Sequence, residues 1–246
     1  MPFDKKQLEI LLINYFRETY TDFPKGILRA SESPDFILTF KNRQQLGIEL
    51  TRLNPKNAMP PDAGENKRNG YRERVIGISK DLFERTSPLK LFVKFLFSEK
   101  IEISVEREML LAIQLTNLIR EAVQSEKEEG FFKILLSGER LPEGIDDLLI
   151  VNHPALNISV WERSNNLGIS NNVVDDIRTS IRKKDEKLEL YQKQRLNYYW
   201  LLIFSDRVRG VRNFNLSEKI INHKFTSHFQ HVFLFDLIKS DIYELI

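Results

Sequence analysis

The chain has 246 residues, which suits one large domain or a core with an inserted subdomain, and its 41% hydrophobic content with 17 Phe excludes global disorder. Its 37 Lys and Arg against 35 Asp and Glu give a net charge of +2, so any binding of nucleic acid must depend on a local patch. Cysteine is absent, which excludes disulfides, thiolate zinc sites, iron–sulfur clusters and cysteine nucleophiles.

The first half of the chain alternates helical and strand patterns. Apolar residues recur with helical spacing near the N-terminus, and two short strand patterns follow, joined by a polar turn. A segment rich in Pro, Asn, Gly and charge comes next and is typical of a long loop. In chain order we predict a helix at 4–20, strands at 35–40 and 46–52, a loop at 54–74, a short helix at 76–86 and a strand at 89–97.

The second half continues in the same way. A long helical stripe is followed by short apolar runs, a second helical stretch with early acids, and two strongly apolar strand patterns. The predicted elements are a helix at 105–128, strands at 131–137, 146–151 and 157–163, a helix at 171–191, and strands at 198–206 and 231–237. This alternation predicts a mixed α/β fold with a central sheet flanked by helices.

No segment predicts contact with a membrane. The N-terminal pattern is an amphipathic helix without a small-residue cleavage site, and no apolar run approaches the roughly 20 residues that span a bilayer. We therefore expect a soluble, cytoplasmic protein.

Each arm of the predicted hairpin contains one acid, Asp35 in the first strand and Glu49 in the second. Strand side chains alternate between faces, so if Phe36 and Ile48 face one core, both acids emerge on the opposite face. A turn near Asn42 would bring them close across the strand pair, although a slip of one residue in the register would separate them.

Two carboxylates on one face repel each other, and a divalent cation between them would remove that repulsion. Mg²⁺ or Mn²⁺ favours carboxylate and carbonyl oxygens, so Asp35, Glu49 and the backbone carbonyl of Leu50 are the predicted ligands. Gly47 leaves room beside the acids. The alternative is that Asp35 forms a turn after Pro34 and that Glu49 faces solvent on a one-sided sheet.

Pro34-Asp35, followed after a hairpin-sized gap by Gly47-Ile48-Glu49-Leu50-Thr51, resembles the motif of the PD-(D/E)XK nuclease superfamily. The resemblance implies hydrolysis of nucleic-acid phosphodiesters with Mg²⁺ bound by the Asp and the Glu. It also implies a restriction endonuclease-like core of a helix, a three-stranded meander, a second helix and a fourth strand. The predicted helix 4–20, strands 35–40, 46–52 and 89–97, helix 171–191 and strand 198–206 would fill those places, within one domain 1–246 that has an insertion at about 100–168.

The sequence departs from the family pattern at Thr51, where the motif has Lys. Thr cannot supply the positive charge that stabilises the transition state. Some members of the family take that lysine from the second helix, and here Lys187 is the first candidate and Lys184 the second, with Tyr191 one turn beyond Lys187. The alternative is that these lysines belong to a solvated charged helix face.

Two further groups complete the predicted site. The first helix of the family often supplies an acid near the metal, for which Glu9 is a candidate and a surface role the alternative. A basic segment just after Glu49 could clamp a phosphate backbone, with an aromatic ring to stack on a base, although a solvated loop is equally compatible with it. The residues of this predicted nucleic-acid surface are Arg52, Lys56, Lys67, Arg68, Tyr71, Arg72 and Arg74.

The sequence thus predicts a Mg²⁺-dependent nuclease that acts on nucleic acid, with DNA expected first, as a monomer or a homodimer. The alternative is a catalytically degenerate nuclease fold that serves as a nucleic-acid-binding or scaffold module, for which Thr51 is the main reason.

Overall fold

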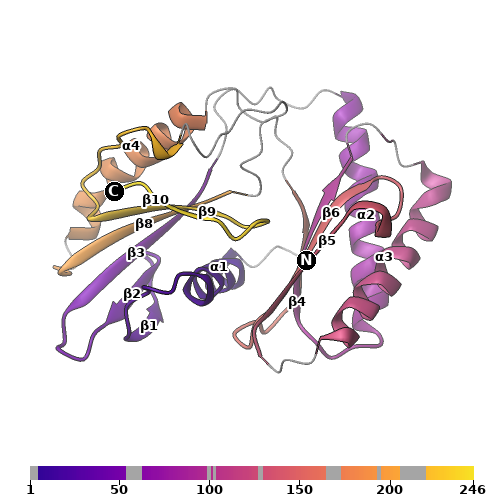
Figure 1. Ribbon diagram of the computed structural model, residues 1–246, viewed down its shortest axis with the longest axis horizontal. Coiled ribbons are helices and arrows are strands. Elements are labelled where there is room, and N and C mark those ends of the chain that lie inside the picture. The colour runs from indigo at the N-terminus through magenta and orange to yellow at the C-terminus, as the bar shows by residue number, and fades with distance from the viewer. Residues whose placement is uncertain are drawn as a thin grey trace. The chain divides into compact units, whose positions relative to one another are not determined.

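The computed structural model describes residues 5–53, 63–98, 101, 104–126, 130–164, 173–192, 195–205 and 220–246. Within these residues the chain forms four α-helices and ten strands in two mixed sheets, which confirms the predicted mixed α/β class (Figure 1). None of the helices among them is long and apolar enough to cross a membrane.

The chain divides into two compact units. Unit 1 comprises Met1–Tyr15 and Pro60–Asn166, and unit 2 comprises Phe16–Met59 and Leu167–Ile246. The boundary falls inside helix α1 (Lys5–Thr19). The expectation of a single domain with an insertion at about 100–168 stays a prediction; the segment that interrupts unit 2 runs over 60–166.

Unit 2 is built on a six-stranded sheet in the order β1-β2-β3-β8-β9-β10. The first three strands form an antiparallel meander, β8 and β9 continue parallel to β3, and β10 closes the edge antiparallel to β9. The strands are β1 Ile27–Ala30, β2 Phe36–Thr39, β3 Gln45–Arg52, β8 Tyr198–Ser205, β9 His231–Asp236 and β10 Ile242–Glu244, with helix α4 at Val173–Gln192 before β8.

The β2–β3 hairpin has the register that the hydrophobic pattern predicts. Phe36 pairs with Ile48 and Leu38 with Leu46, and all four side chains are buried. The turn is closed by a hydrogen bond from Phe40 N to Gln44 O, and Arg43 takes a left-handed conformation with φ of 69°. The register is therefore the one that brings Asp35 and Glu49 to one face.

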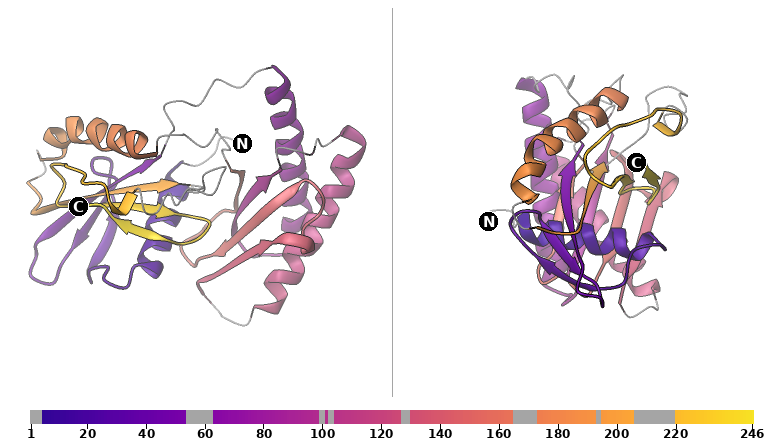
Figure 2. Two further views of the ribbon diagram at one scale, coloured as in Figure 1. Left: turned by 45° about the horizontal axis from the view of Figure 1, so that its top comes forward. Right: turned by 90° about the vertical axis from the view of Figure 1, so that its left-hand side faces the viewer.

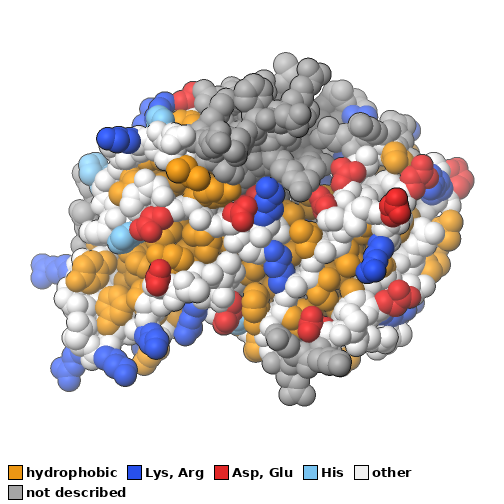
Figure 3. All heavy atoms as spheres, in the orientation of Figure 1, with side chains coloured by type: hydrophobic (Ala, Val, Ile, Leu, Met, Phe, Trp, Pro, Cys, Tyr) orange, Lys and Arg blue, Asp and Glu red, His pale blue; other side chains and the backbone are white. Residues whose placement is uncertain are grey.

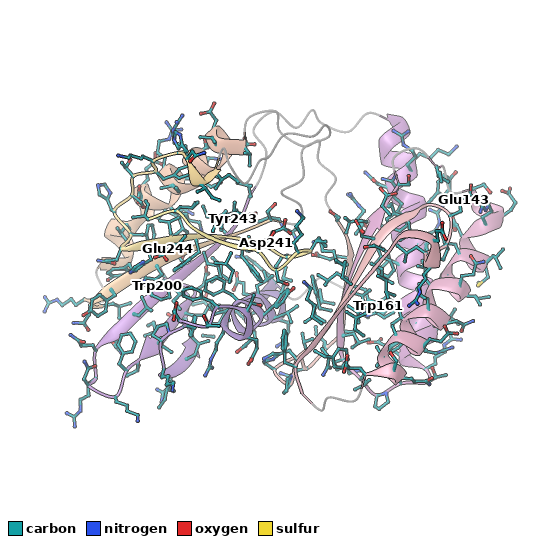
Figure 4. All side chains as sticks on the ribbon, in the orientation of Figure 1. Glu143, Trp161, Trp200, Asp241, Tyr243 and Glu244 are labelled. Atoms are coloured by element: carbon teal, nitrogen blue, oxygen red, sulfur yellow. The ribbon has the colours of Figure 1, made fainter. Side chains whose placement is uncertain are left out.

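Each face of this sheet has its own cover within unit 2. Helix α4 packs Ile177 and Ile181 on Leu201 and Ile203 of β8, as Figure 2 shows for the helix lying across the strands. On the opposite face, the ring of Phe16 lies 5.3 Å from that of Phe233. The partly buried Trp200 also lies on that face, with its ring 5.2 Å from that of Phe233 (Figure 4).

Unit 1 is built on a four-stranded sheet in the order β5-β6-β4-β7, with helices α2 and α3 on one face. Trp161 is buried in the core between the sheet and these two helices (Figure 4). On the other face of β4, the fully buried Lys94 lies 2.5 Å from Glu162 of β7, its register partner. The elements are α2 Ala63–Glu84, β4 Leu91–Phe97, α3 Val105–Ser125, β5 Phe132–Ser137, the 3-10 helix Gly138–Arg140, β6 Ile145–Asn152 and β7 Val160–Arg163.

Two sequence-based assignments are wrong. Residues 63–74, predicted as part of a loop, form the first half of α2, because apolar residues such as Val75 and Ile76 are buried against α3 and stabilise a helix of low apolar content. Residues 89–97 are not the third meander strand, because β4 belongs to the sheet of unit 1. The meander instead begins with β1, whose four residues are mostly exposed and give no apolar alternation.

Candidate active site on the α4 face of unit 2

Glu49 projects from the middle of β3 toward helix α4. It pairs in parallel register with Leu201, which packs in the core beneath α4, so both side chains lie on that face of the sheet. Gly47 and Thr51 share this face with Glu49 because strand side chains alternate. Glu49 is only 5% exposed, an unusual position for a carboxylate.

Lys184 of α4 reaches down to Glu49. Its Nζ lies 2.6 Å from Glu49 Oε1, and the two side chains are only 17% and 7% exposed. The same helix turns Ile177, Ile181 and Leu188 toward the sheet, so Lys184 takes the place of an apolar residue on the packed side of the helix. The cation beside Glu49 therefore comes from helix α4.

Asp35 lies where β2 begins. Continuing the register of Phe36 with Ile48 places it opposite Glu49 and on the same face. Its Oδ2 accepts a hydrogen bond of 2.8 Å from the backbone N–H of Leu50. The Asp35 carboxylate thus continues the strand ladder for one bond beyond β2, beside the residue that follows Glu49.

The Leu50 carbonyl points in the plane of the sheet toward β2, the strand that Asp35 precedes. Leu53 N bonds to Phe204 of β8, so alternation directs the N–H and C=O groups of Leu50 toward β2. Two carboxylates and one carbonyl are hard oxygen donors of the kind that Mg²⁺ takes, and the residues present fit the predicted ion.

Pro34 packs where a side chain at position 47 would lie, so only glycine fits there. A Cβ on Gly47 would lie 2.7 Å from Cγ of Pro34 and 2.8 Å from Cδ1 of Leu196. The space beside the acids is therefore filled by packed side chains, which hold the start of β2 against β3. Tyr199, next to Gly47, is buried, and this burial raises the pKa of its hydroxyl.

The other predicted catalytic residues have different surroundings. Lys187, the first candidate for the missing lysine, is exposed on α4. Glu9 belongs to unit 1, where it forms ion pairs of 3.1 Å with Lys5 and 3.3 Å with Lys6. The side chain of Tyr191 lies outside the described residues.

Most of the predicted nucleic-acid surface lies on α2 of unit 1, and part of it is engaged in that unit's packing. Arg72 is buried and donates a 2.9 Å hydrogen bond to Ser98 O, while Arg74 lies 2.6 Å from Glu108. The ring centre of Tyr71 lies 4.7 Å from the guanidinium carbon of Arg74 and 5.9 Å from Nζ of Lys67. Arg68 is half-buried on α2, Arg52 of β3 lies over the ring of Phe204 at 5.6 Å, and Lys56 is outside the described residues.

The sequence identified the two acids but not what fixes them. The hydrogen bond from Leu50 N to Asp35 was missed, because strand alternation predicts which face a side chain takes but not which backbone N–H it accepts from. In the described chain, no group of three or more His, Cys, Asp or Glu side chains is arranged to hold a metal. A metal at this site would therefore depend on two carboxylates and backbone oxygen.

Comparisons of the chain with protein-family models, with curated proteins and with solved structures found no match. The functional argument therefore rests on the residues of the site.

Proposed function

We propose that this protein is a Mg²⁺-dependent nuclease that hydrolyses phosphodiester bonds of nucleic acid, with DNA as the first substrate to test. The observation that carries the proposal is the approach of Lys184 to Glu49, on the sheet face that also bears Asp35. A buried ion pair is costly to form, and it stabilises a fold less than apolar residues of similar volume often do. Such a pair beside a second carboxylate is better explained by chemistry than by stability.

The order of elements in unit 2 supports the same proposal. The end of α1 is followed by the meander β1–β2–β3, then α4, then β8 parallel to β3. This is the order of the core that the PD-(D/E)XK resemblance implies, once β1 replaces the strand first assigned to it. The two acids lie at the start of the second strand and in the third, and the lysine lies on the second helix.

Each residue has a role that follows from its chemistry. Asp35, Glu49 and the Leu50 carbonyl would hold the ion, and Asp35 is kept in place by its hydrogen bond from Leu50 N. A bound Mg²⁺ polarises phosphate oxygens and lowers the pKa of bound water. Lys184, an ammonium group in a site sheltered from water, stabilises negative charge that develops on the phosphate. We place this activity in the cytoplasm.

Cleavage assays test the proposal. Wild type should cut plasmid, linear DNA or RNA with Mg²⁺ or Mn²⁺ and not with EDTA. Glu49→Gln should lower the rate by about 10²–10³, the usual loss when one preorganised charge-stabilising group is removed. Glu186→Gln, at an exposed glutamate of α4, is the matched control and should retain wild-type activity. Cleavage that survives Glu49→Gln would contradict the proposal.

Thr51 favours a second candidate function, a degenerate nuclease fold that binds nucleic acid or acts as a scaffold. Here Lys184 would be a permanent partner of Glu49 that neutralises it. In that case wild type would bind nucleic acid without cutting it under any metal condition, and Lys184→Met would not change that result.

A further inference from the structure

Helix α4 has two flanks with different surroundings. On one flank, Asp185 accepts hydrogen bonds from Ser227 Oγ at 2.7 Å and from His228 N at 3.0 Å. Arg178 on the same flank lies 3.1 Å from His223. These partners belong to the segment that leads into β9, so this flank faces the β9 side of the sheet.

Lys183 and Lys187 lie on the opposite flank. Successive helix residues are about 100° apart, which puts both lysines about 160–200° around the helix from Asp185. Since β9 and β3 lie on opposite sides of β8, this second flank looks over β3 and β2, the strands of Glu49 and Asp35. Lys184, which contacts Glu49, lies between this flank and the sheet.

Both lysines are exposed, and neither forms an ion pair with any side chain in the described part of the chain. They are one turn apart and therefore neighbours on the helix surface. Glu186, the exposed acid beside them, is directed about 100° away from Lys187, on the side of the helix that faces away from the sheet. Arg72 and Arg74 of α2, in contrast, are held by Ser98 and Glu108.

We propose that Lys183 and Lys187 form a binding site for backbone phosphates that flank the phosphate held at Asp35 and Glu49. The identity of the polyanion rests on the proposed function. Lysine ammonium groups on flexible stems bind phosphates as point charges, without reading sequence. Their separation of about 6 Å along the helix axis spans about two nucleotides of one strand.

Unit 2 offers a second group of exposed cations for comparison. Lys25 and Lys41 lie near the start of β1 and the β2–β3 turn, at the end of the hairpin away from Asp35. Figure 3 shows basic side chains gathered over this region, at the lower left. These residues have the charge of the α4 flank without its position beside the acids.

The test measures binding of a labelled DNA duplex by fluorescence anisotropy in EDTA, over a series of salt concentrations. Lys183→Gln/Lys187→Gln is compared with Lys25→Gln/Lys41→Gln, which removes the same charge from exposed lysines of the same unit. Each phosphate contact contributes about 0.9 to the slope of log Kd against log salt, so the first variant should lose about 1.8 from the slope, and bind more weakly at low salt. The second should keep the wild-type slope.

Equal effects of the two variants would overturn the inference, because they would show a response to net charge alone. An unchanged slope for Lys183→Gln/Lys187→Gln would also overturn it, as would a wild type that does not bind the duplex. Binding that follows the expected slopes without cleavage in Mg²⁺ would support this site and contradict the nuclease proposal. Because all four lysines are exposed, both variants should fold, and thermal unfolding of each one checks this.

Discussion

Lys184 Nζ lies 2.6 Å from Glu49 Oε1, and this contact joins helix α4 to strand β3 across 135 residues of sequence. Both side chains are largely buried, so both charges are largely shielded from bulk water. The stability of unit 2 and the proposed chemistry of its site therefore depend on the same pair.

Lys184→Met should lower the free energy of unfolding by about 3–5 kcal/mol, because it leaves a buried carboxylate without its cation. Glu49→Gln combined with Lys184→Met should recover much of that loss, since no buried charge is then left uncompensated. Chemical denaturation of the two single variants and the double variant measures the coupling. Additive losses would show that the two groups do not interact.

Asp35 allows its structural and chemical roles to be separated. Asp35→Asn retains an acceptor for Leu50 N–H, so unfolding should remain within about 1 kcal/mol of wild type, whereas Asp35→Ala should cost about 1.5–3 kcal/mol. Both variants should lose metal-dependent cleavage because both remove the charge. Denaturation and cleavage of the same samples test this; cleavage by Asp35→Asn at the wild-type rate would remove Asp35 from the site.

Gly47→Ala should destabilise unit 2 by about 1–3 kcal/mol, because the added methyl group overlaps the ring of Pro34 and a methyl of Leu196. The shift of Pro34 moves Asp35, so cleavage should fall as well. Gly77→Ala is the matched control. Its Cβ would meet no atom within 4 Å, and alanine should stabilise the interior of α2 by about 0.5–1 kcal/mol. Thermal unfolding should show lower stability for Gly47→Ala and higher stability for Gly77→Ala than for wild type.

Lys94→Met should destabilise unit 1 by about 3–5 kcal/mol, because Lys94 is fully buried and its removal leaves Glu162 without its closest cation. Lys90→Met is the comparison, since Lys90 is 40% exposed and lies 3.9 Å from Glu84; its effect should stay within about 0.5 kcal/mol. A similar small effect at both positions, measured by denaturation, would show that the Lys94–Glu162 pair is not required for the stability of unit 1.

Tyr199 predicts a loss of stability at alkaline pH. Burial raises the pKa of its hydroxyl above the ordinary value of about 10. A raised pKa means that the stabilisation is fully present below the unfolded-state pKa and is lost as pH rises through the folded-state pKa. Unfolding free energy should therefore fall above about pH 10, and Tyr199→Phe should reduce that fall. An identical alkaline profile in wild type and Tyr199→Phe would contradict this account.

Local patterns predicted the parts of the fold that depend on periodicity. The alternation around Phe36 and Ile48 predicted the hairpin, its register and the common face of Asp35 and Glu49, because a slip would expose the apolar side chains. Strand β1 and the first half of helix α2 were beyond reach of the same reasoning. The first is short and exposed, and the second is stabilised by packing on α3 rather than by its own pattern.

The choice between Lys184 and Lys187 could not be made from spacing. Both lie on a helix with charges at almost every exposed position, and the deciding fact is which one projects on the side of Ile177 and Ile181. That side depends on how α4 packs on β8, a long-range contact. The family-like spacing favoured Lys187, whereas the packing places Lys184 at Glu49.

Titration of the protein with Mn²⁺, followed by calorimetry, tests most directly whether Asp35 and Glu49 share one divalent ion. Wild type and Glu186→Gln should each bind the ion at one site, and Asp35→Asn and Glu49→Gln should each abolish that binding. Wild type that binds no Mn²⁺, or a Glu49→Gln variant that binds it as well as wild type does, would contradict the account.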